Sequence, residues 1–463
     1  MVTRLTPDDA SFLELESSSS PVHIGSLAIA DNTSGALTYE NLVDIVSQRL
    51  CLVPRYRQKV RQVPFGLARP VWVDDADFDV SYHIRRSALP NPGTDEQLFE
   101  LVARLSSRPL DTSRPLWEIY LVEGLSDNRV AIFTKSHSAL VDGADALEIG
   151  HVILDASRQP QELADDLWMP MDGPTESALA MTAVAELLTN PGQGMEFLRR
   201  TAGGVGETAR TVERSLSRFV SALHTATRAT PSSPLNTDIS HHRRFAAART
   251  NLADYRKIRA RFGCTINDAI LTVLTGALRN WLFSRGEPIT ESSTVRALVP
   301  MSVYVSESAA DQSSEVSSFL VDLPVGEPNP VIRLSHVSHA NAAHGRQRRG
   351  VRARTLVRLS GFAPASLHAM SVRSAFEYAE RAFNLMITNA PGPQSPMFIA
   401  GARMLEMYPV SPLLKNQALS IGLTSYDGSV FYGFHADRDA MADVDLISTM
   451  LYESLEELLD ACA

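Results

Sequence analysis

A change of composition in the middle of the chain constrains its fold more than any other feature. Residues 157–236 are rich in Ala, Ser, Thr, Gly and Pro, a composition typical of connecting segments. On either side, short β-rich runs alternate with helical spacings of apolar residues. We therefore predict an α/β fold with α+β mixed sheets, in which two similar-sized lobes, 1–156 and 237–463, are joined by a helical connector over 157–236.

The same patterns place individual elements along both lobes. A turn signal at 126–128 between two β-rich runs predicts a β-hairpin. The other runs predict strands at 22–30, 69–74, 294–299, 316–323, 385–389, 418–425 and 430–436. Helical spacing predicts helices at 39–50, 95–105, 144–154, 176–188, 195–227, 265–281, 330–343, 372–383 and 444–459.

The overall composition limits the class of protein. With 463 residues, 44% of them apolar, the chain can bury a large core without a disulfide or a metal ion. A net charge of −10 argues against a nucleic-acid partner. Three widely spaced cysteines indicate a reducing compartment and offer no metal-ligand spacing. Because the first residues include acids and no apolar run is long enough to span a bilayer, we expect a cytoplasmic protein, with a place on a membrane surface left open.

The stretch from Lys135 to Gly143 is the first candidate for chemistry. A predicted strand at 130–135 delivers His137 to a loop, and Asp142-Gly143 then turns the chain toward a helix. A histidine there could act as a general base, since its ordinary pKa lies near neutrality. The alternative is a histidine at a strand end whose hydrogen bonds are satisfied, with Asp142 as a turn or capping residue.

Three further motifs have both a structural and a functional reading. Pro115-Leu116-Trp117 opens a strand, and packing is the simpler explanation for it. Asn267-Asp268 stands where a helix begins, so the two residues could cap the helix or present a polar group to substrate in a cleft. Asn389-Ala390-Pro391-Gly392 reads as a rigid turn after a strand, which could also shape a crossover between the lobes.

Taken in order along the chain, these motifs resemble the bacterial wax ester synthase/diacylglycerol acyltransferases. The resemblance also rests on Leu5–Phe12, Pro54–Arg57, Trp72–Asp79 and Tyr408–Pro412. It implies a CoA-dependent acyltransferase fold, with two chloramphenicol-acetyltransferase-like lobes and a tunnel between them. It further implies transfer from acyl-CoA to diacylglycerol or a long-chain alcohol, giving triacylglycerol or wax ester, with no metal and no permanently bound cofactor.

The family's active loop reads His-His-x-x-x-Asp-Gly, and its second histidine is taken as the base. In this chain that position is Ser138, and only the first histidine is kept, as His137. The resemblance thus assigns His137, Ser138, Asp142 and Gly143 to the catalytic loop. A serine hydroxyl does not take up a proton near pH 7, so Ser138 cannot act as the imidazole does.

Two hypotheses from different classes follow, and acyl transfer to some other hydroxyl or amine acceptor is a third option. The first is an acyltransferase that uses His137 and works in the cytoplasm, peripheral to the membrane or to lipid inclusions. The second is a protein that keeps the fold and binds acyl-CoA or lipid without catalysis. Its support is that Tyr304 and Ser314 also depart from the family pattern.

Overall fold

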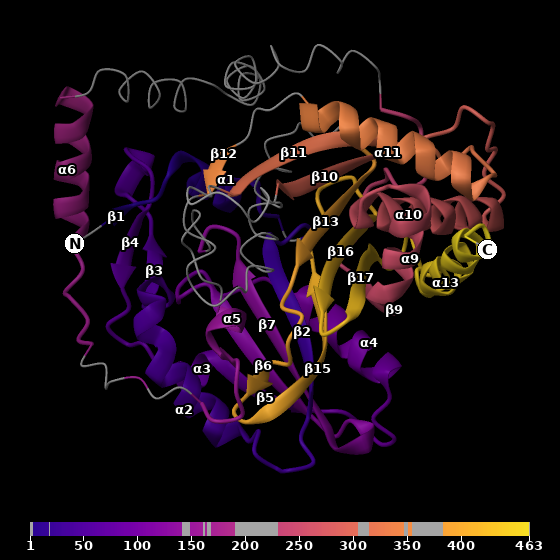
Figure 1. Cartoon of the computed structure of the whole chain (residues 1–463). Coiled ribbons are helices and arrows are strands. Elements are labelled where there is room, and N and C mark those ends of the chain that lie inside the picture. The colour runs from indigo at the N-terminus through magenta and orange to yellow at the C-terminus, as the bar shows by residue number, and fades with distance from the viewer. Residues whose placement is uncertain are drawn as a thin grey trace.

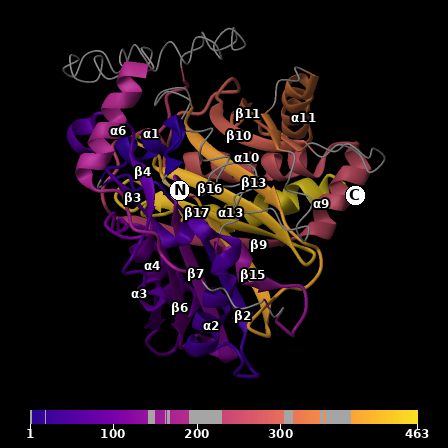
Figure 2. The same ribbon diagram turned by 90° about the vertical axis from the view of Figure 1, so that its left-hand side faces the viewer.

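The computed structural model places two seven-stranded sheets side by side, with helices on their outer faces (Figures 1 and 2). A three-stranded sheet lies at one side of the molecule (Figure 1). The structure describes residues 3–17, 19–140, 149–160, 163, 168–189, 230–303, 314–346, 351–353 and 383–462.

The first large sheet is built mainly from the N-terminal part of the chain. Only β5 and β6 run parallel; the other neighbours are antiparallel. The predicted hairpin is confirmed, because β6 and β7 pair on either side of the turn η4 at Ser126–Asn128. In order across the sheet the strands are β5 (Ile84–Ala88), β6 (Trp117–Glu123), β7 (Arg129–His137), β2 (His23–Asp31), β15 (Ala402–Val410), β14 (Phe398–Ile399) and β8 (Leu154–Asp155).

The helices of this region cover the sheet with their apolar sides. In α4 (Asp95–Ser106) the apolar residues at helical spacing are buried, and a capping box formed by Thr94 and Gln97 fixes its start. The remaining helical elements are α1 (Pro7–Leu15), α2 (Tyr39–Arg49), α3 (Val80–His83), α5 (Ile149–Val152), η1 (Leu50–Leu52), η2 (Pro54–Arg57) and η3 (Pro64–Gly66).

The second large sheet comes from the C-terminal part of the chain. Its central strand β13 runs parallel to both neighbours, and the outer pairs are antiparallel. Across the sheet the order is β12 (Val351–Ala353), β11 (Ser314–Leu323), β10 (Val295–Val303), β13 (Leu385–Pro391), β16 (Leu419–Tyr426), β17 (Ser429–Asp437) and β9 (Arg243–Asn251). An apolar core lies between it and α9 (Leu252–Phe262), α10 (Ile266–Ser284), α11 (Pro330–Arg346) and α13 (Asp445–Asp460).

The first large sheet includes a strand from the C-terminal part of the chain. Strand β15 belongs to the C-terminal part yet pairs with β2 of the first sheet, and in Figure 1 it lies among the indigo and purple strands. It also contacts β16 and β17. A Cβ added to Gly433 would lie 2.0 Å from the carbonyl oxygen of Pro409, so the close crossing requires glycine there. The lobe limits 1–156 and 237–463 stay a prediction. The structure shows in addition that β15, from the C-terminal part, pairs within the first sheet.

The predicted connector is described only in part. Helix α6 (Glu176–Thr189) matches the predicted helix at 176–188 and ends one residue later, and its Leu179 packs against Val71 and Val73 of the small sheet. That sheet contains β1 (Thr3–Arg4), β4 (Val71–Asp74) and β3 (Gln58–Arg61). The predicted helices at 195–227 and 372–383 fall almost wholly outside the described residues. Over the part of the chain that the structure describes, no helix has both the length and the apolar character needed to cross a membrane.

Candidate active site

The pairing of β2 with β7 brings two histidines together. His23 is the register partner of His137, and Gly25 is the partner of Lys135. Because side chains alternate along a strand, these four residues lie on one face of the first sheet. The two imidazole rings are edge to face, with centroids 6.0 Å apart. Asp142 and Gly143, the other two residues of the predicted catalytic loop, lie outside the described residues.

His137 is held in place from three sides. Its backbone N–H donates to the carbonyl of Leu116 at 2.9 Å, and its Nδ1 accepts from the backbone N–H of Ala139 at 3.0 Å. An Nδ1 that accepts carries no proton, so the neutral ring has its proton on Nε2. Nε2 lies 3.5 Å from a carboxylate oxygen of Glu16. In this arrangement neither nitrogen of His137 has a lone pair free for a substrate.

Ser138 is bound to the backbone of the neighbouring segment. Both its N–H and its hydroxyl donate to the carbonyl of Val22, at 3.0 and 3.1 Å, and the residue is buried. The side chain at the position of the family's second histidine therefore serves here as an anchor between two chain segments.

Glu16 lies between the two histidines. Its carboxylate oxygens are 3.1 Å from Nε2 of His23 and 3.5 Å from Nε2 of His137, although neither contact is aligned as a hydrogen bond. Burial alone would raise the pKa of the Glu16 carboxyl, but the contacts with His137 and then His23 outweigh it, and the pKa lies well below its usual value. Burial lowers the pKa of His23 to about 4 despite the Glu16 contact. At neutral pH, a charged Glu16 thus faces a neutral His23.

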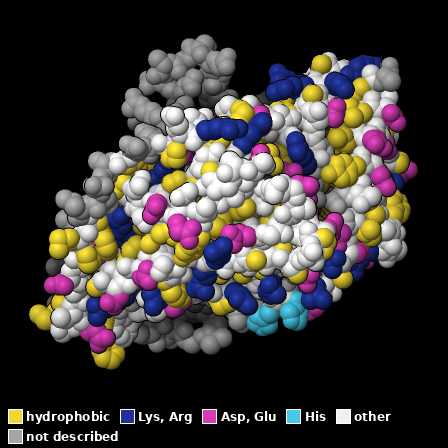
Figure 3. All heavy atoms as spheres, turned by 90° about the horizontal axis from the view of Figure 1, so that it is seen from below, with side chains coloured by type: hydrophobic (Ala, Val, Ile, Leu, Met, Phe, Trp, Pro, Cys, Tyr) yellow, Lys and Arg dark blue, Asp and Glu magenta, His cyan; other side chains and the backbone are white. Residues whose placement is uncertain are grey.

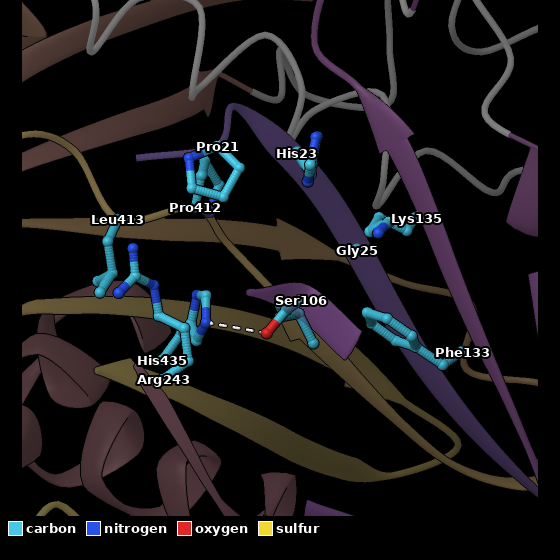
Figure 4. A pocket seen from close by; sticks show the side chains of 11 residues that line it. Pro21, His23, Gly25, Ser106, Phe133, Lys135, Arg243, Pro412, Leu413 and His435 are labelled. Carbon is cyan, nitrogen blue, oxygen red and sulfur yellow. Dashed lines mark hydrogen bonds between the residues drawn. The ribbon is translucent and has the colours of Figure 1, made fainter. Parts of the chain in front are cut away.

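A small pocket lies between the two large sheets, and His23 is in its wall (Figure 4). The first sheet and its helix α4 contribute Gly25, Phe133, Lys135 and Ser106, and the second sheet contributes Arg243 and His435. The rest of the wall is apolar or proline: Pro21, Val410, Pro412 and Leu413. The pocket thus combines imidazole and cationic groups with an apolar lining.

The cations in this wall are already paired. Nζ of Lys135 lies 3.1 Å from Glu118 and donates to the carbonyl of Arg108 at 2.9 Å. Burial lowers the pKa of Lys135, and the nearby Glu118 opposes this. Arg243 lies 3.4 Å from Asp437 and also donates to the carbonyl of Ser19.

His435 is fixed by two hydrogen bonds. Its Nδ1 contacts the carbonyl of Ser411 at 2.7 Å and therefore carries the proton, and Nε2 lies 3.2 Å from the hydroxyl of Ser106 (Figure 4). Burial and then the charge of Arg243 lower the pKa of His435 to about 3, so the ring is neutral at ordinary pH.

The motif at the start of α10 is hydrogen-bonded within the protein. Asp268 accepts from the backbone N–H of Thr265 at 2.9 Å and from the side-chain amide of Asn341 at 2.6 Å. Asn267 accepts from the side-chain amide of Asn389 at 2.8 Å, which joins two motifs far apart in the sequence. The structure therefore shows capping by Asp268 and a cross-link by Asn267. Their predicted contact with substrate stays a prediction.

The remaining motif residues lie in packed surroundings. Trp117 is fully buried, and its Nε1 donates to the carbonyl of Tyr56 at 2.7 Å. Leu116 is buried and supplies the carbonyl that binds the N–H of His137, while Pro115 accepts from the N–H of Trp117. Pro391 ends β13, and the N–H of Gly392 donates to the carbonyl of Ser425 on β16.

No group of three metal-ligating side chains occurs among the described residues. The side chains of two positions that depart from the family pattern are not described by the structure. Tyr304 lies outside the described residues, and only the backbone of Ser314 is described.

Comparison with known proteins identifies the family. Residues 5–270 match the model of the wax ester synthase/diacylglycerol acyltransferase catalytic domain, and residues 313–459 match that of the WS/DGAT C-terminal domain. The chain belongs to the wax ester synthase/diacylglycerol acyltransferase family. This membership confirms the resemblance seen in the sequence and the acyltransferase class that it implied.

Individual members of this acyltransferase family agree with the assignment. The chain is 32% identical to the probable diacylglycerol O-acyltransferase tgs1 of Mycobacterium tuberculosis over 460 residues, which cover 99% of this chain and 96% of that one. It is 50% identical to the probable enzyme tgs3 of the same organism over 265 residues, 57% of this chain and 98% of the relative. The solved wax ester synthase/diacylglycerol acyltransferase of Marinobacter aquaeolei VT8 covers 99% of both chains at 27% identity, with a TM-score of 0.69, which confirms the predicted mixed α/β fold.

Several residues in or beside this pocket were not predicted from the sequence. Glu16, His23, Ser106, Arg243 and His435 come together only when the sheets pair and pack. One signal was available: Lys135 is a charged residue inside an apolar strand, and such a residue needs a buried partner. The others lie in runs whose local pattern gives no sign of a site.

Proposed function

We propose that this protein transfers the acyl group of acyl-CoA to the hydroxyl of diacylglycerol, making triacylglycerol, and that it can also make wax esters from long-chain alcohols. The observation that carries the proposal is the match to the family over nearly the whole chain, including the relative tgs1, which is named as a probable diacylglycerol O-acyltransferase. The pocket between the two sheets supports it, because an imidazole and apolar side chains line the same space.

The reaction needs a base and no redox partner. As the acceptor oxygen attacks the thioester carbonyl carbon, its proton passes to the base. The tetrahedral intermediate then collapses, the carbon–sulfur bond breaks, and the proton returns to the CoA thiolate. The products are an ester and free CoA. A positioned base is worth roughly 10²–10⁴-fold in the rate of such a step.

The proposal treats acyl-CoA as a substrate and includes no metal and no permanently bound cofactor. It places the protein in the cytoplasm, peripheral to the membrane or to lipid inclusions, where its acceptors are found. Among the described residues on the face shown in Figure 3, basic, acidic and apolar side chains are mixed. Flotation of the purified protein with liposomes that contain diacylglycerol tests the membrane contact.

A second function stays open because of Ser138. A protein with serine at this position could bind acyl-CoA or lipid without turning it over. Purified protein incubated with labelled acyl-CoA and diacylglycerol separates the two. Labelled triacylglycerol above a control without protein supports the enzyme. Saturable binding of acyl-CoA without product supports the binding protein and contradicts the proposed function.

A further inference from the structure

The polar side chains of the pocket differ in whether they are hydrogen-bonded to the protein. Lys135, Arg243, Ser106 and His435 all bind protein groups. Among the described side chains of the wall, only the imidazole of His23 lacks a hydrogen bond, although His23 is just 6% exposed. A buried polar atom without a hydrogen-bond partner lowers the stability of the fold. Such an atom in the wall of a pocket therefore points to a ligand that supplies the missing hydrogen bond.

The contacts of His23 indicate which nitrogen a ligand would meet. Nε2 lies 3.1 Å from Glu16, whose charge favours the proton on that side of the ring. The neutral imidazole then has its lone pair on Nδ1. In a general base of this type, a carboxylate orients an imidazole whose second nitrogen accepts the proton. Here Glu16 acts on His23 through its charge at 3.1 Å and not through an aligned hydrogen bond.

The neighbouring candidates lack such a lone pair. Nδ1 of His137 already accepts the N–H of Ala139, and its Nε2 faces Glu16. The hydroxyl of Ser138 donates to Val22. His435 has one nitrogen on Ser411 and the other on Ser106. Among the described imidazoles of this site, only that of His23 has neither nitrogen in a hydrogen bond.

We propose that His23 is the catalytic base of this acyltransferase, with Glu16 as its positioning residue. The inference deepens the proposed function and rests on it. Nδ1 of His23 accepts the proton of the acceptor hydroxyl while the oxygen attacks the thioester, and returns it to the CoA sulfur as the carbon–sulfur bond breaks. The apolar wall formed by Phe133, Val410 and Leu413 suits a hydroxyl carried by an apolar molecule.

The test compares variants of the full-length protein in one assay with labelled oleoyl-CoA and dioleoylglycerol. We expect His23→Gln to lower kcat roughly 100-fold or more while the Kd for oleoyl-CoA changes less than about twofold. His137→Gln should lower kcat less than about tenfold. His83→Gln is the matched control. His83 is also a buried histidine, but it stacks on Trp117 with ring centroids 4.4 Å apart and does not line the pocket.

Chemical rescue distinguishes a variant that fails to fold from a folded variant that lacks only the base. Added imidazole should restore part of the turnover of His23→Ala in a dose-dependent way, since it can enter the space left by the ring, and it should do nothing for His83→Ala. At equal thermal stability, Glu16→Asp, which keeps the carboxylate, should retain more of the wild-type turnover than Glu16→Gln.

The outcomes distinguish this inference from the proposed function. A wild-type protein that makes ester, together with a His23→Gln variant of wild-type kcat, overturns the role of His23 and leaves the acyltransferase intact. A wild-type protein that makes no ester with diacylglycerol or hexadecanol overturns both.

Discussion

Nδ2 of Asn389 donates a hydrogen bond to Oδ1 of Asn267 across 2.8 Å, and so ties the end of strand β13 to the start of helix α10. Both side chains are half-buried. Each belongs to a separate motif in the sequence, Asn389 to a turn motif and Asn267 to a helix start. Their contact shows that the two motifs form one structural unit at the end of the central strand of the second sheet.

This contact predicts a coupling between the two residues. In a double-mutant cycle of Asn267→Ala and Asn389→Ala, each single change should lose the same hydrogen bond. The double variant should therefore be less destabilised than the sum of the singles, by about 0.5–1.5 kcal/mol. Urea unfolding followed by circular dichroism measures it. Additive effects would contradict the link.

Asp268 gives a prediction that separates capping from substrate binding. Asp268→Ala removes the acceptor for the N–H of Thr265 and for the amide of Asn341, so we expect a loss of about 2 kcal/mol in unfolding free energy with KM for acyl-CoA within twofold. Asp254→Ala is the control. Among the described residues the ion-pair partner of Asp254 is the exposed Lys257, so the change should cost less than about 0.5 kcal/mol. A raised KM with unchanged stability would instead support the predicted contact with substrate.

Much of the fold could be predicted because its signals are local. The hairpin of β6 and β7 follows from a turn between two β-rich runs, and α10 from its cap and its apolar spacing. Strand β15 was not predicted, since its partner β2 is nearly the whole chain away and no local pattern encodes that pairing. Strand β9 and helix α9 were also missed.

Some residues of the candidate site could likewise be predicted from the sequence, and others could not. His137 could be found because it stands beside a recognisable loop. His23 could not, because its place depends on the register that sets it opposite His137 and on a second sheet that closes the pocket. Neither relation is visible in the residues around His23.

Ser138 should matter for packing more than for catalysis. Ser138→Ala removes the hydroxyl that donates to Val22, so we expect a loss of about 1 kcal/mol in unfolding free energy and a kcat within twofold of wild type. A stability measurement and a turnover assay on the same preparation check both parts. A fall in kcat of tenfold or more at unchanged stability would give the hydroxyl a direct part in the reaction.

The two neutral buried histidines predict destabilisation by acid. Burial lowers the pKa of His23 to about 4 and that of His435 to about 3, whereas the unfolded chain has the ordinary value of 6.5. Below pH 6.5 the unfolded state therefore takes up protons that the folded state does not, and stability falls as the pH falls toward 4.

Burial is the main cause of both lowered pKa values, and nearby groups modify them. Glu16, Lys135 and His137 affect the pKa of His23, and Arg243 that of His435. The Glu16 carboxyl, whose pKa is also lowered, adds loss in the same direction below pH 4.5. At pH about 5, His23→Gln should reduce the slope of unfolding free energy against pH by about 1 kcal/mol per pH unit. An unchanged slope in urea titrations would contradict a neutral His23.

The crossing of β15 over the second sheet predicts a severe effect at Gly433. A Cβ there would lie 2.0 Å from the carbonyl oxygen of Pro409, and this oxygen belongs to the backbone of a paired strand, which cannot move aside without breaking its pairing with β2. Gly433→Ala should therefore cost about 3 kcal/mol or more in unfolding free energy. Gly173→Ala is the control, because its nearest neighbour would be a side-chain nitrogen of Arg61 at an ordinary 3.5 Å. Equal stability of the two variants would mean that β15 crosses the sheet at a greater distance than the structure shows.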